Sequence, residues 1–209
     1  GYDGDLSLAG RYVAYSLNQE SFRFMLDPML QNGSERISAM GYGNAINALS
    51  DTEGGMAKYF SQRFAQVTNP PLDSIREADG MSMRVALGAK PDGTGSATRQ
   101  LVVESPILGH LDMVRLREQD IVPLERFDML YVPVPADEQA NAAAVRSAVD
   151  ALCDAVEAFA RTSGGIAVLT DRAVSSTHAP LPVILAVAAV NQRLIETGLR
   201  LQLPGQGEV

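Results

Sequence analysis

The sequence predicts an α/β fold in which βαβ units form a parallel sheet, preceded by a helical and irregular N-terminal portion. Two observations predict this fold. The second half of the chain alternates short apolar segments with long amphipathic ones, and the first half holds short helical segments separated by loops that contain Gly and Pro. We therefore expect one domain over residues 1–209, with the helical and irregular portion at 1–100 and a βαβαβ portion at 101–209.

The N-terminal portion contains two segments with helical periodicity. Residues 20–30 place apolar side chains three or four positions apart, and Gly33 follows as a stop signal. Residues 53–65 repeat the pattern. Asn69 follows shortly afterwards and precedes a proline, which disfavours the helical conformation at Asn69, so the helix should end before it. Residues 88–98 are rich in Gly and other turn formers, so we expect an exposed loop there.

The C-terminal portion predicts three strands joined by two helices. The strands are 129–134, Ile166–Thr170 and 199–203, and the helices are 137–161 and 181–197. Two glycines end the first helix, and two prolines suit the first turn of the second helix: Gly164, Gly165, Pro180 and Pro182. Strands joined through helices at this spacing are expected to be parallel, with right-handed crossovers.

Both helices of this portion carry enough apolar surface to need extensive cover. The first has one apolar stripe, formed by Val145, Val149, Leu152, Val156 and Phe159. The second is apolar nearly all round over residues 181–190, so it must be covered on several sides. One short strand after it cannot supply that cover. The pattern therefore predicts a piece of a larger protein.

Composition and charge exclude several classes of function. The net charge of −8 and the pI of about 4.7 argue against nucleic-acid binding, because the basic residues form no patch or stripe. The longest apolar run is too short to cross a membrane. The single cysteine, Cys153, excludes an internal disulfide and a cysteine-based metal cluster, which fits a cytoplasmic location. Its place beside the apolar stripe predicts a core thiol.

The loop after the second strand, residues 171–178, holds the densest set of polar side chains. Asp171, Ser176 and His178 could be proposed as a hydrolytic triad, but the segment lacks the strand-to-helix elbow that exposes a nucleophilic serine. Asp171 and Arg172 are more typical of a local ion pair or a helix cap. A small hydrolase and an independent small-molecule-binding or regulatory domain remain alternatives that would use this loop.

No other segment predicts a complete site. His110 and His178 lie far apart and have no second ligand at helical spacing, so a metal site is not expected, and His110 suits the start of a helix. Gly164 and Gly165 lie at a helix-to-strand turn, the opposite end from a phosphate cradle. We therefore expect no catalytic, cofactor-binding or metal-binding residue in this segment.

Several stretches resemble one known family. Residues 64–77 read FAQVTNPPLDSIRE and residues 99–108 read RQLVVESPIL, and both resemble the central domain of the glutamate synthase large subunit. Further stretches agree in the same order, namely residues 37–51, 169–172 and 182–194. The matches run from about residue 20 to residue 200. The resemblance implies that residues 1–209 are a single central domain of a larger multidomain chain.

The resemblance also implies a role. In that family a glutaminase domain releases ammonia from L-glutamine, and an FMN-binding barrel adds it to 2-oxoglutarate and reduces the imine to L-glutamate. The central domain links the two, resembles a rudimentary copy of the barrel, and helps form the ammonia tunnel. The implied parent is an oxidoreductase with FMN and an iron–sulfur cluster outside this segment, and a small reductase subunit is a further candidate partner. The isolated domain is expected to be inactive.

By the same resemblance, one turn is the best candidate to face the tunnel or the adjoining domains: Gln66, Val67, Thr68, Asn69 and Pro70. A Pro-Pro turn fixes backbone carbonyls that can accept hydrogen bonds from ammonia. A rigid turn that only packs domains together is an equally open reading. Asp171 and Arg172 are candidates for an interdomain contact.

Overall fold

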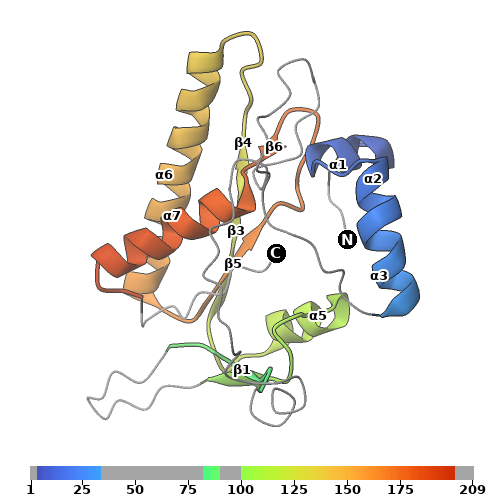
Figure 1. Cartoon of the computed structure of the whole chain (residues 1–209). Coiled ribbons are helices and arrows are strands. Elements are labelled where there is room, and N and C mark those ends of the chain that lie inside the picture. The colour runs from blue at the N-terminus through green and yellow to red at the C-terminus, as the bar shows by residue number, and fades with distance from the viewer. Residues whose placement is uncertain (1–3, 34–81, 90–99, 201–209) are drawn as a thin grey trace, which may run out of the picture.

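The computed structural model describes residues 4–33, 82–89 and 100–200 (Figure 1). Helices and strands alternate through the C-terminal part, and short helices form the N-terminal part. The helical elements are α1 Leu8–Ala14, α2 Gln19–Ser21, the π-helical turn Phe22–Leu26, α3 Asp27–Asn32, α5 His110–Glu118, α6 Glu138–Thr162 and α7 Val183–Glu196. The strands are β1 Val85–Leu87, β2 Leu101–Val103, β3 Leu124–Asp128, β4 Leu130–Tyr131, β5 Ile166–Thr170 and β6 Ala179–Pro180. The mixed α/β class is confirmed.

The predicted helix at 20–30 is confirmed as a continuous helical segment through α2, the π-helical turn and α3. Asn18 begins it, because its side-chain oxygen accepts a hydrogen bond from the Ser21 backbone N–H at 2.9 Å. Gly33 ends it in the left-handed conformation, with φ of 63°. The predicted helix at 53–65 and most of the predicted loop at 88–98 lie outside the described residues.

One parallel βαβ unit forms the centre of the C-terminal part. β3 and β5 pair in parallel, with Leu124 opposite Ile166 and Asp128 opposite Thr170, and α6 connects them. The bounds predicted for α6 and β5 are confirmed to within a residue. Gly165 makes the turn between them possible: its φ is +119°, and a Cβ there would overlap the Pro123 carbonyl.

The predicted strand at 129–134 is wrong. The strand that pairs with β5 is β3, which ends at Asp128, and only Leu130 and Tyr131 of the predicted range form a strand. β4 pairs antiparallel with β6 instead. β3 reads LERFD, with three charged residues, so its apolar signal is weaker than that of the MLYVPV segment that follows it.

Met129 joins the two pairings. Its backbone N–H donates to the Thr170 carbonyl at 2.8 Å, which extends the parallel ladder by one residue. Its carbonyl accepts from the Leu181 N–H at 2.8 Å, which leads into the antiparallel pair. The side chain is 2% exposed. A single extended segment from β3 to β4 therefore changes partner at this residue.

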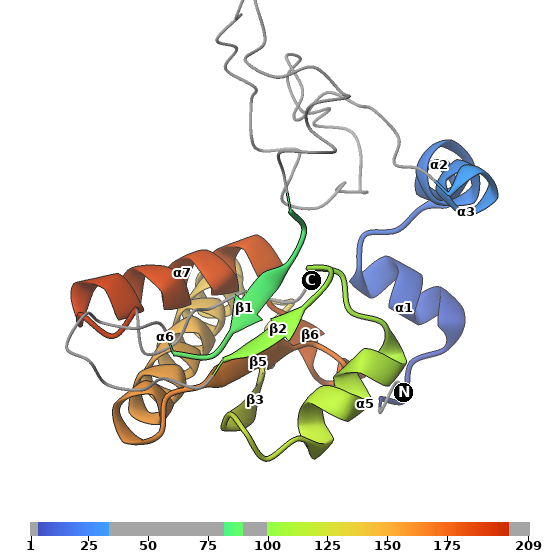
Figure 2. The same ribbon diagram turned by 90° about the horizontal axis from the view of Figure 1, so that it is seen from below.

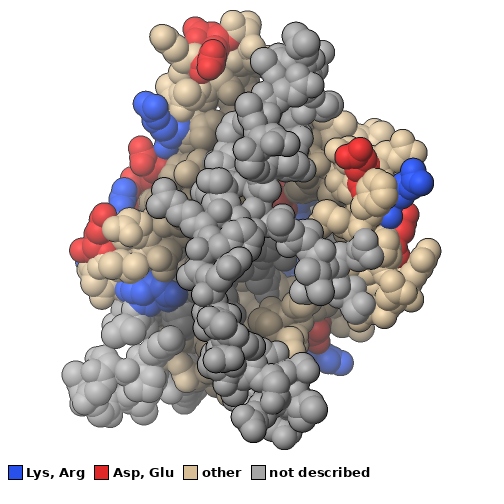
Figure 3. All heavy atoms as spheres, in the orientation of Figure 1, with Lys and Arg blue, Asp and Glu red and all other residues tan. Residues whose placement is uncertain are grey.

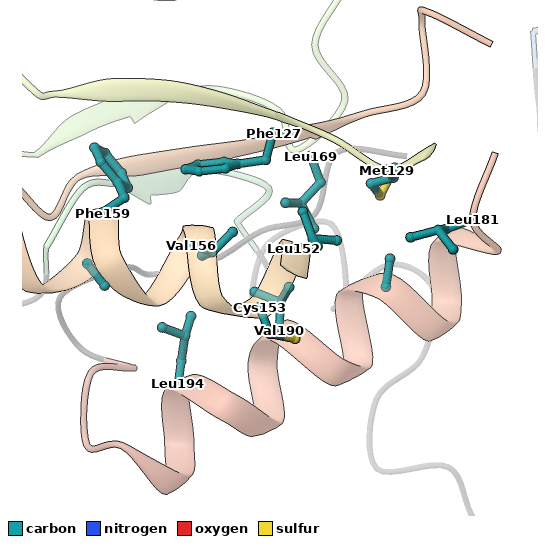
Figure 4. Close-up of a cluster of buried hydrophobic side chains, with 12 residues drawn as sticks. Phe127, Met129, Leu152, Cys153, Val156, Phe159, Leu169, Leu181, Val190 and Leu194 are labelled. Carbon is teal, nitrogen blue, oxygen red and sulfur yellow. The ribbon is translucent and has the colours of Figure 1, made fainter. Parts of the chain in front are cut away.

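Helices α6 and α7 cover one side of these strands. Phe127 of β3 and Leu169 of β5 pack against Val156 and Phe159 of α6 in a shared cluster, with the two phenylalanine ring centroids 5.9 Å apart (Figure 4). The predicted apolar stripe of α6 is confirmed: Leu152, Val156 and Phe159 are buried, and Val145 and Val149 pack against the cluster half-buried. Cys153 lies in this core, as predicted.

The opposite side of the strands is covered by the β1–β2 pair and α5 (Figure 2). Ile166 and Val168 of β5 form a second cluster there with Leu87 of β1 and Leu116 of α5. Burial on both sides explains the near-continuous apolar sequence of β5. The parallel pair is thus held between two layers.

Helix α7 confirms the predicted helix at 181–197 within two residues at either end. Pro182 directly precedes it, but Pro180 pairs with Leu130 in β6 and does not lie in its first turn. Arg193 binds α7 to α6, because its guanidinium lies 2.6 Å from Asp154 and 3.3 Å from Glu157.

The predicted last strand at 199–203 is only partly described. Leu199 and Arg200 follow the turn at Gly198 and are not in a strand, and the remaining positions lie outside the described residues. The sheets of the described part have two strands each, and none is closed. The helices found in residues 4–33 and 100–200 include none with the length and apolar character that crossing a membrane requires.

Candidate functional site

A groove of about 540 Å³ runs along β3 and β5, from Leu124 at the start of β3 to the residues at the carboxyl ends of both strands. Leu124 of β3 and Val168 and Thr170 of β5 contribute to its lining, together with Met113 of α5 and Tyr15, the residue after α1. Sites in parallel α/β units form at the carboxyl ends of the strands. The groove is therefore the place where the fold would position a functional site.

Asp171 and Arg172 both line this groove. The expected ion pair or helix cap is wrong: within residues 4–33, 82–89 and 100–200 the two side chains form no ion pair, and a tight turn, not a helix, follows β5. The Asp171 carbonyl accepts from the Val174 N–H at 3.0 Å, and the Arg172 N–H donates to the Thr170 hydroxyl at 3.3 Å. Backbone bonding thus shapes the turn and leaves both side chains at the groove.

The N-terminal segment is attached to the loop after β5. The Ser176 hydroxyl and N–H donate to the two carboxylate oxygens of Asp5 at 2.6 and 2.7 Å, and the Tyr15 hydroxyl donates to the Asp171 carbonyl at 3.3 Å. The hydrogen bonds from Ser176, first from its hydroxyl and then from its N–H, lower the pKa of Asp5 below 3.8. No local sequence signal marks this contact, because its partners lie 171 residues apart.

The same contacts decide against the hydrolytic triad. The Ser176 hydroxyl is bound to Asp5, and His178 Nδ1 instead lies 3.0 Å from the Thr177 hydroxyl and 3.5 Å from that of Ser175. A nucleophilic serine needs its base within hydrogen-bond reach. Ser176, His178 and Asp171 are therefore not brought together as a catalytic set.

Three arginines from separate elements also line the groove: Arg117 of α5, Arg126 of β3 and Arg172 after β5. Asp171 is the one acidic residue among the described lining residues. The sequence analysis did not single out Arg117 or Arg126. Arg126 lies two residues after Leu124 in β3 and therefore on the same side of the sheet, but this relation could not be predicted because β3 itself was missed.

The remaining candidates have structural roles. His110 is the first residue of α5, as expected, and the Asp112 carboxylate accepts from the Gly109 N–H at 3.0 Å. Burial raises the pKa of the Cys153 thiol, which suits a core position. The described residues contain no group of His, Cys, Asp and Glu that could hold a metal ion. Gln66, Val67, Thr68, Asn69 and Pro70 lie outside the described residues.

The sequence matches the family model "Glutamate synthase central domain" over residues 10–204. It is 34% identical to the glutamate synthase [NADPH] large chain of Azospirillum brasilense over 92% of this chain and 13% of that protein. The ferredoxin-dependent glutamate synthase of Oryza sativa subsp. japonica is 31% identical over 90% of this chain and 12% of its own length. The glutamate synthase [NADH] of Schizosaccharomyces pombe is also 31% identical, over 90% of this chain and 9% of its own length.

These matches cover nearly the whole chain, whereas the chain spans only about an eighth or less of the length of each of these relatives. The relatives are all glutamate synthases, and the family model describes one domain within such proteins. The chain therefore belongs to the glutamate synthase central domain family, as the resemblance predicted.

Proposed function

We propose that this chain is the non-catalytic central domain of a glutamate synthase, where it links the glutaminase domain to the FMN-binding domain and helps form the ammonia tunnel. The observation that carries the proposal is the match over 92% of this chain to only 13% of the large chain. Because the matched segment is so small a part of the large chain, the proposal places the catalytic reactions in the other domains of that chain. The parent enzyme would make L-glutamate from L-glutamine and 2-oxoglutarate, in glutamate biosynthesis and ammonia assimilation.

The tunnel has a physical reason. Ammonia released into water would diffuse away and become protonated, and protonation removes the lone pair that attacks the 2-oxo group. A closed path between the two reaction sites keeps ammonia neutral and local. The turn at Gln66–Pro70 would line this path or pack the adjoining domains, and Asp171 and Arg172 would contribute to an interdomain contact.

The proposal extends to the parent's other parts. FMN and an iron–sulfur cluster would lie outside this segment, in a cytoplasmic oxidoreductase that also works with a small reductase subunit. Within this segment, the β3–α6–β5 unit supports a partial, barrel-like parallel sheet as the arrangement of the whole domain. Neither nucleic acid nor a membrane is expected as a partner.

The tunnel is tested in the full-length enzyme by placing a bulky side chain at the candidate lining, which would narrow the passage. Replacing Thr68 with Trp would place a large ring at the candidate lining, so ammonia made from glutamine should escape before it reaches 2-oxoglutarate. We expect more ammonia released per glutamate formed, while synthesis from added ammonia is less affected. Both products are measured in the same assay.

Arg146→Gln is the matched control, because Arg146 is exposed on α6 and does not line the groove. It should keep the wild-type ratio of ammonia to glutamate. An unchanged ratio in a folded Thr68→Trp enzyme would contradict the tunnel position and leave the turn with a packing role.

The two alternatives differ in their support. The hydrolase is not favoured, because the Ser176 hydroxyl is bound to the Asp5 carboxylate and not to His178. The small-molecule-binding or regulatory domain is favoured by one observation: the 540 Å³ groove falls within the range of roughly 300–1,000 Å³ typical of ligand sites. What that groove would accept is decided by its arginines.

A further inference from the structure

The groove along β3 and β5 gathers three arginines that have no ion-pair partner among the residues that the structure describes. Arg117, Arg126 and Arg172 are all exposed, and none forms an ion pair with another residue of the described part. Four of the other described arginines have acidic partners: Arg84, Arg115, Arg161 and Arg193. On the face drawn in Figure 3, acidic and basic side chains are interspersed along the outer helices.

The fold places these three side chains around one space. Arg126 is two residues from Leu124 on β3, so both lie on the side of the sheet that faces α5, and its register partner is Val168. Arg172 follows the end of β5, and Arg117 directly follows Leu116, which anchors α5 in the core beneath. The anchoring of all three elements keeps the charges at the groove when the side chains move.

The chemistry of the groove fits carboxylates carried on a polypeptide. A guanidinium can bind a carboxylate through two parallel hydrogen bonds, and three separate arginines would bind several carboxylates along a segment. Between them the groove is apolar: Leu108, Leu124 and Val168 line it, and Ile107 is 75% exposed at its rim. An acidic segment with interspersed apolar side chains would satisfy both kinds of surface.

We propose that this groove docks an acidic segment of the parent polypeptide outside residues 1–209, and this rests on the proposed function as a domain of a longer chain. Two arguments identify the occupant. Among the described residues, the lining carries three guanidiniums against the single carboxylate of Asp171. The relatives contain this domain as 13% or less of their length, so most of each chain lies outside it.

Charge also explains why docking would be specific. The chain has a net charge of −8, so its surface as a whole repels an acidic segment. The groove is a local exception, and complementary charges fix orientation and register more than they add affinity. The arginines would thus select the place at which the segment docks.

The test replaces each groove arginine with lysine in the full-length enzyme, one at a time, and treats it with a carbodiimide. Lysine keeps the positive charge. The carbodiimide adds to a carboxyl group to give an O-acylisourea, and a lysine amine in contact with it forms the amide and displaces the urea. We expect Arg117→Lys, Arg126→Lys and Arg172→Lys to cross-link to Asp or Glu outside residues 1–209, as identified by mass spectrometry.

Arg146→Lys on α6 is the matched control and should give no such product. The yield at the groove should fall several-fold in 1 M salt, where the screening length shrinks to about 3 Å. Cross-links confined to carboxylates within residues 1–209, or no product above that of the control, would overturn the docking. So would a small dicarboxylate such as succinate, if it alone raised the melting temperature of the wild type and Arg126→Gln abolished that shift.

The outcome is separable from that of the tunnel. Thr68→Trp reports whether ammonia escapes, and the lysine variants report what touches the groove. Cross-links without ammonia escape would support the docking and contradict the tunnel position. Ammonia escape without cross-links would support the tunnel and overturn the docking.

Discussion

At the scale of single residues, Asp5 matters because it fastens the N-terminal segment to the loop after β5. We expect Asp5→Asn to weaken this attachment, since an amide has one acceptor oxygen and carries no charge. Hydrogen exchange at the Ser176 N–H should become faster in the variant. Asp5→Glu, which keeps the charge but lengthens the side chain, serves as the control and should retain part of the protection.

The lowered pKa of Asp5 fixes the sign of the pH dependence. The pKa of Asp5 in the folded protein lies below the ordinary value of 3.8. The stability that the ionised carboxylate contributes is therefore fully present above pH 3.8, and it is lost as the pH falls through the folded pKa. Exchange in the wild type, corrected for the intrinsic rate at each pH, should therefore approach that of Asp5→Asn only below pH 3.8. Equal corrected rates in the two proteins at pH 7 would contradict the role of Asp5.

At the scale of elements, α6 is held by its buried stripe. Leu152 is 5% exposed in the core cluster, and we expect Leu152→Ala to lower the free energy of unfolding by roughly 2–5 kcal/mol. Denaturant unfolding measures the change. Ala151→Ser on the exposed side of the same helix is the control and should change stability by no more than about 0.5 kcal/mol. A Leu152→Ala effect as small as the control's would contradict the packing of α6.

The elements also separate what the sequence could predict from what it could not. α6 and β5 were predictable because their apolar patterns are long or continuous, and α3 because Gly33 marks its end. β3 was missed because only Phe127 of its five residues is fully buried, so its pairing with β5 depends on contacts distant in sequence. The groove was half predictable: Asp171 and Arg172 follow an evident strand, whereas Arg117 and Tyr15 reach it only through tertiary packing.

At the scale of the whole molecule, the chain supplies a groove and a strand framework without an assembled catalytic set in its described part. We expect the domain, expressed alone, to show neither glutaminase activity nor the absorbance of bound flavin. The measurements are ammonia release from glutamine and a visible spectrum of the purified protein. The full-length enzyme is the control and should show both properties. A yellow domain with flavin absorbance would contradict this prediction.

The attachment of the N-terminal helices through Asp5 and Tyr15 has a consequence for how the domain folds. Their partners, Ser176 and Asp171, lie 171 and 156 residues later in the chain. Contacts between such distant positions form slowly, because closing a long loop costs conformational entropy before the contacts contribute any stabilising free energy. On the ribosome, α1 emerges long before β5 exists, with Leu8 and Val13 among its exposed apolar residues. Docking of this segment would therefore be a late event in the biogenesis of the domain, after the β3–α6–β5 unit has formed.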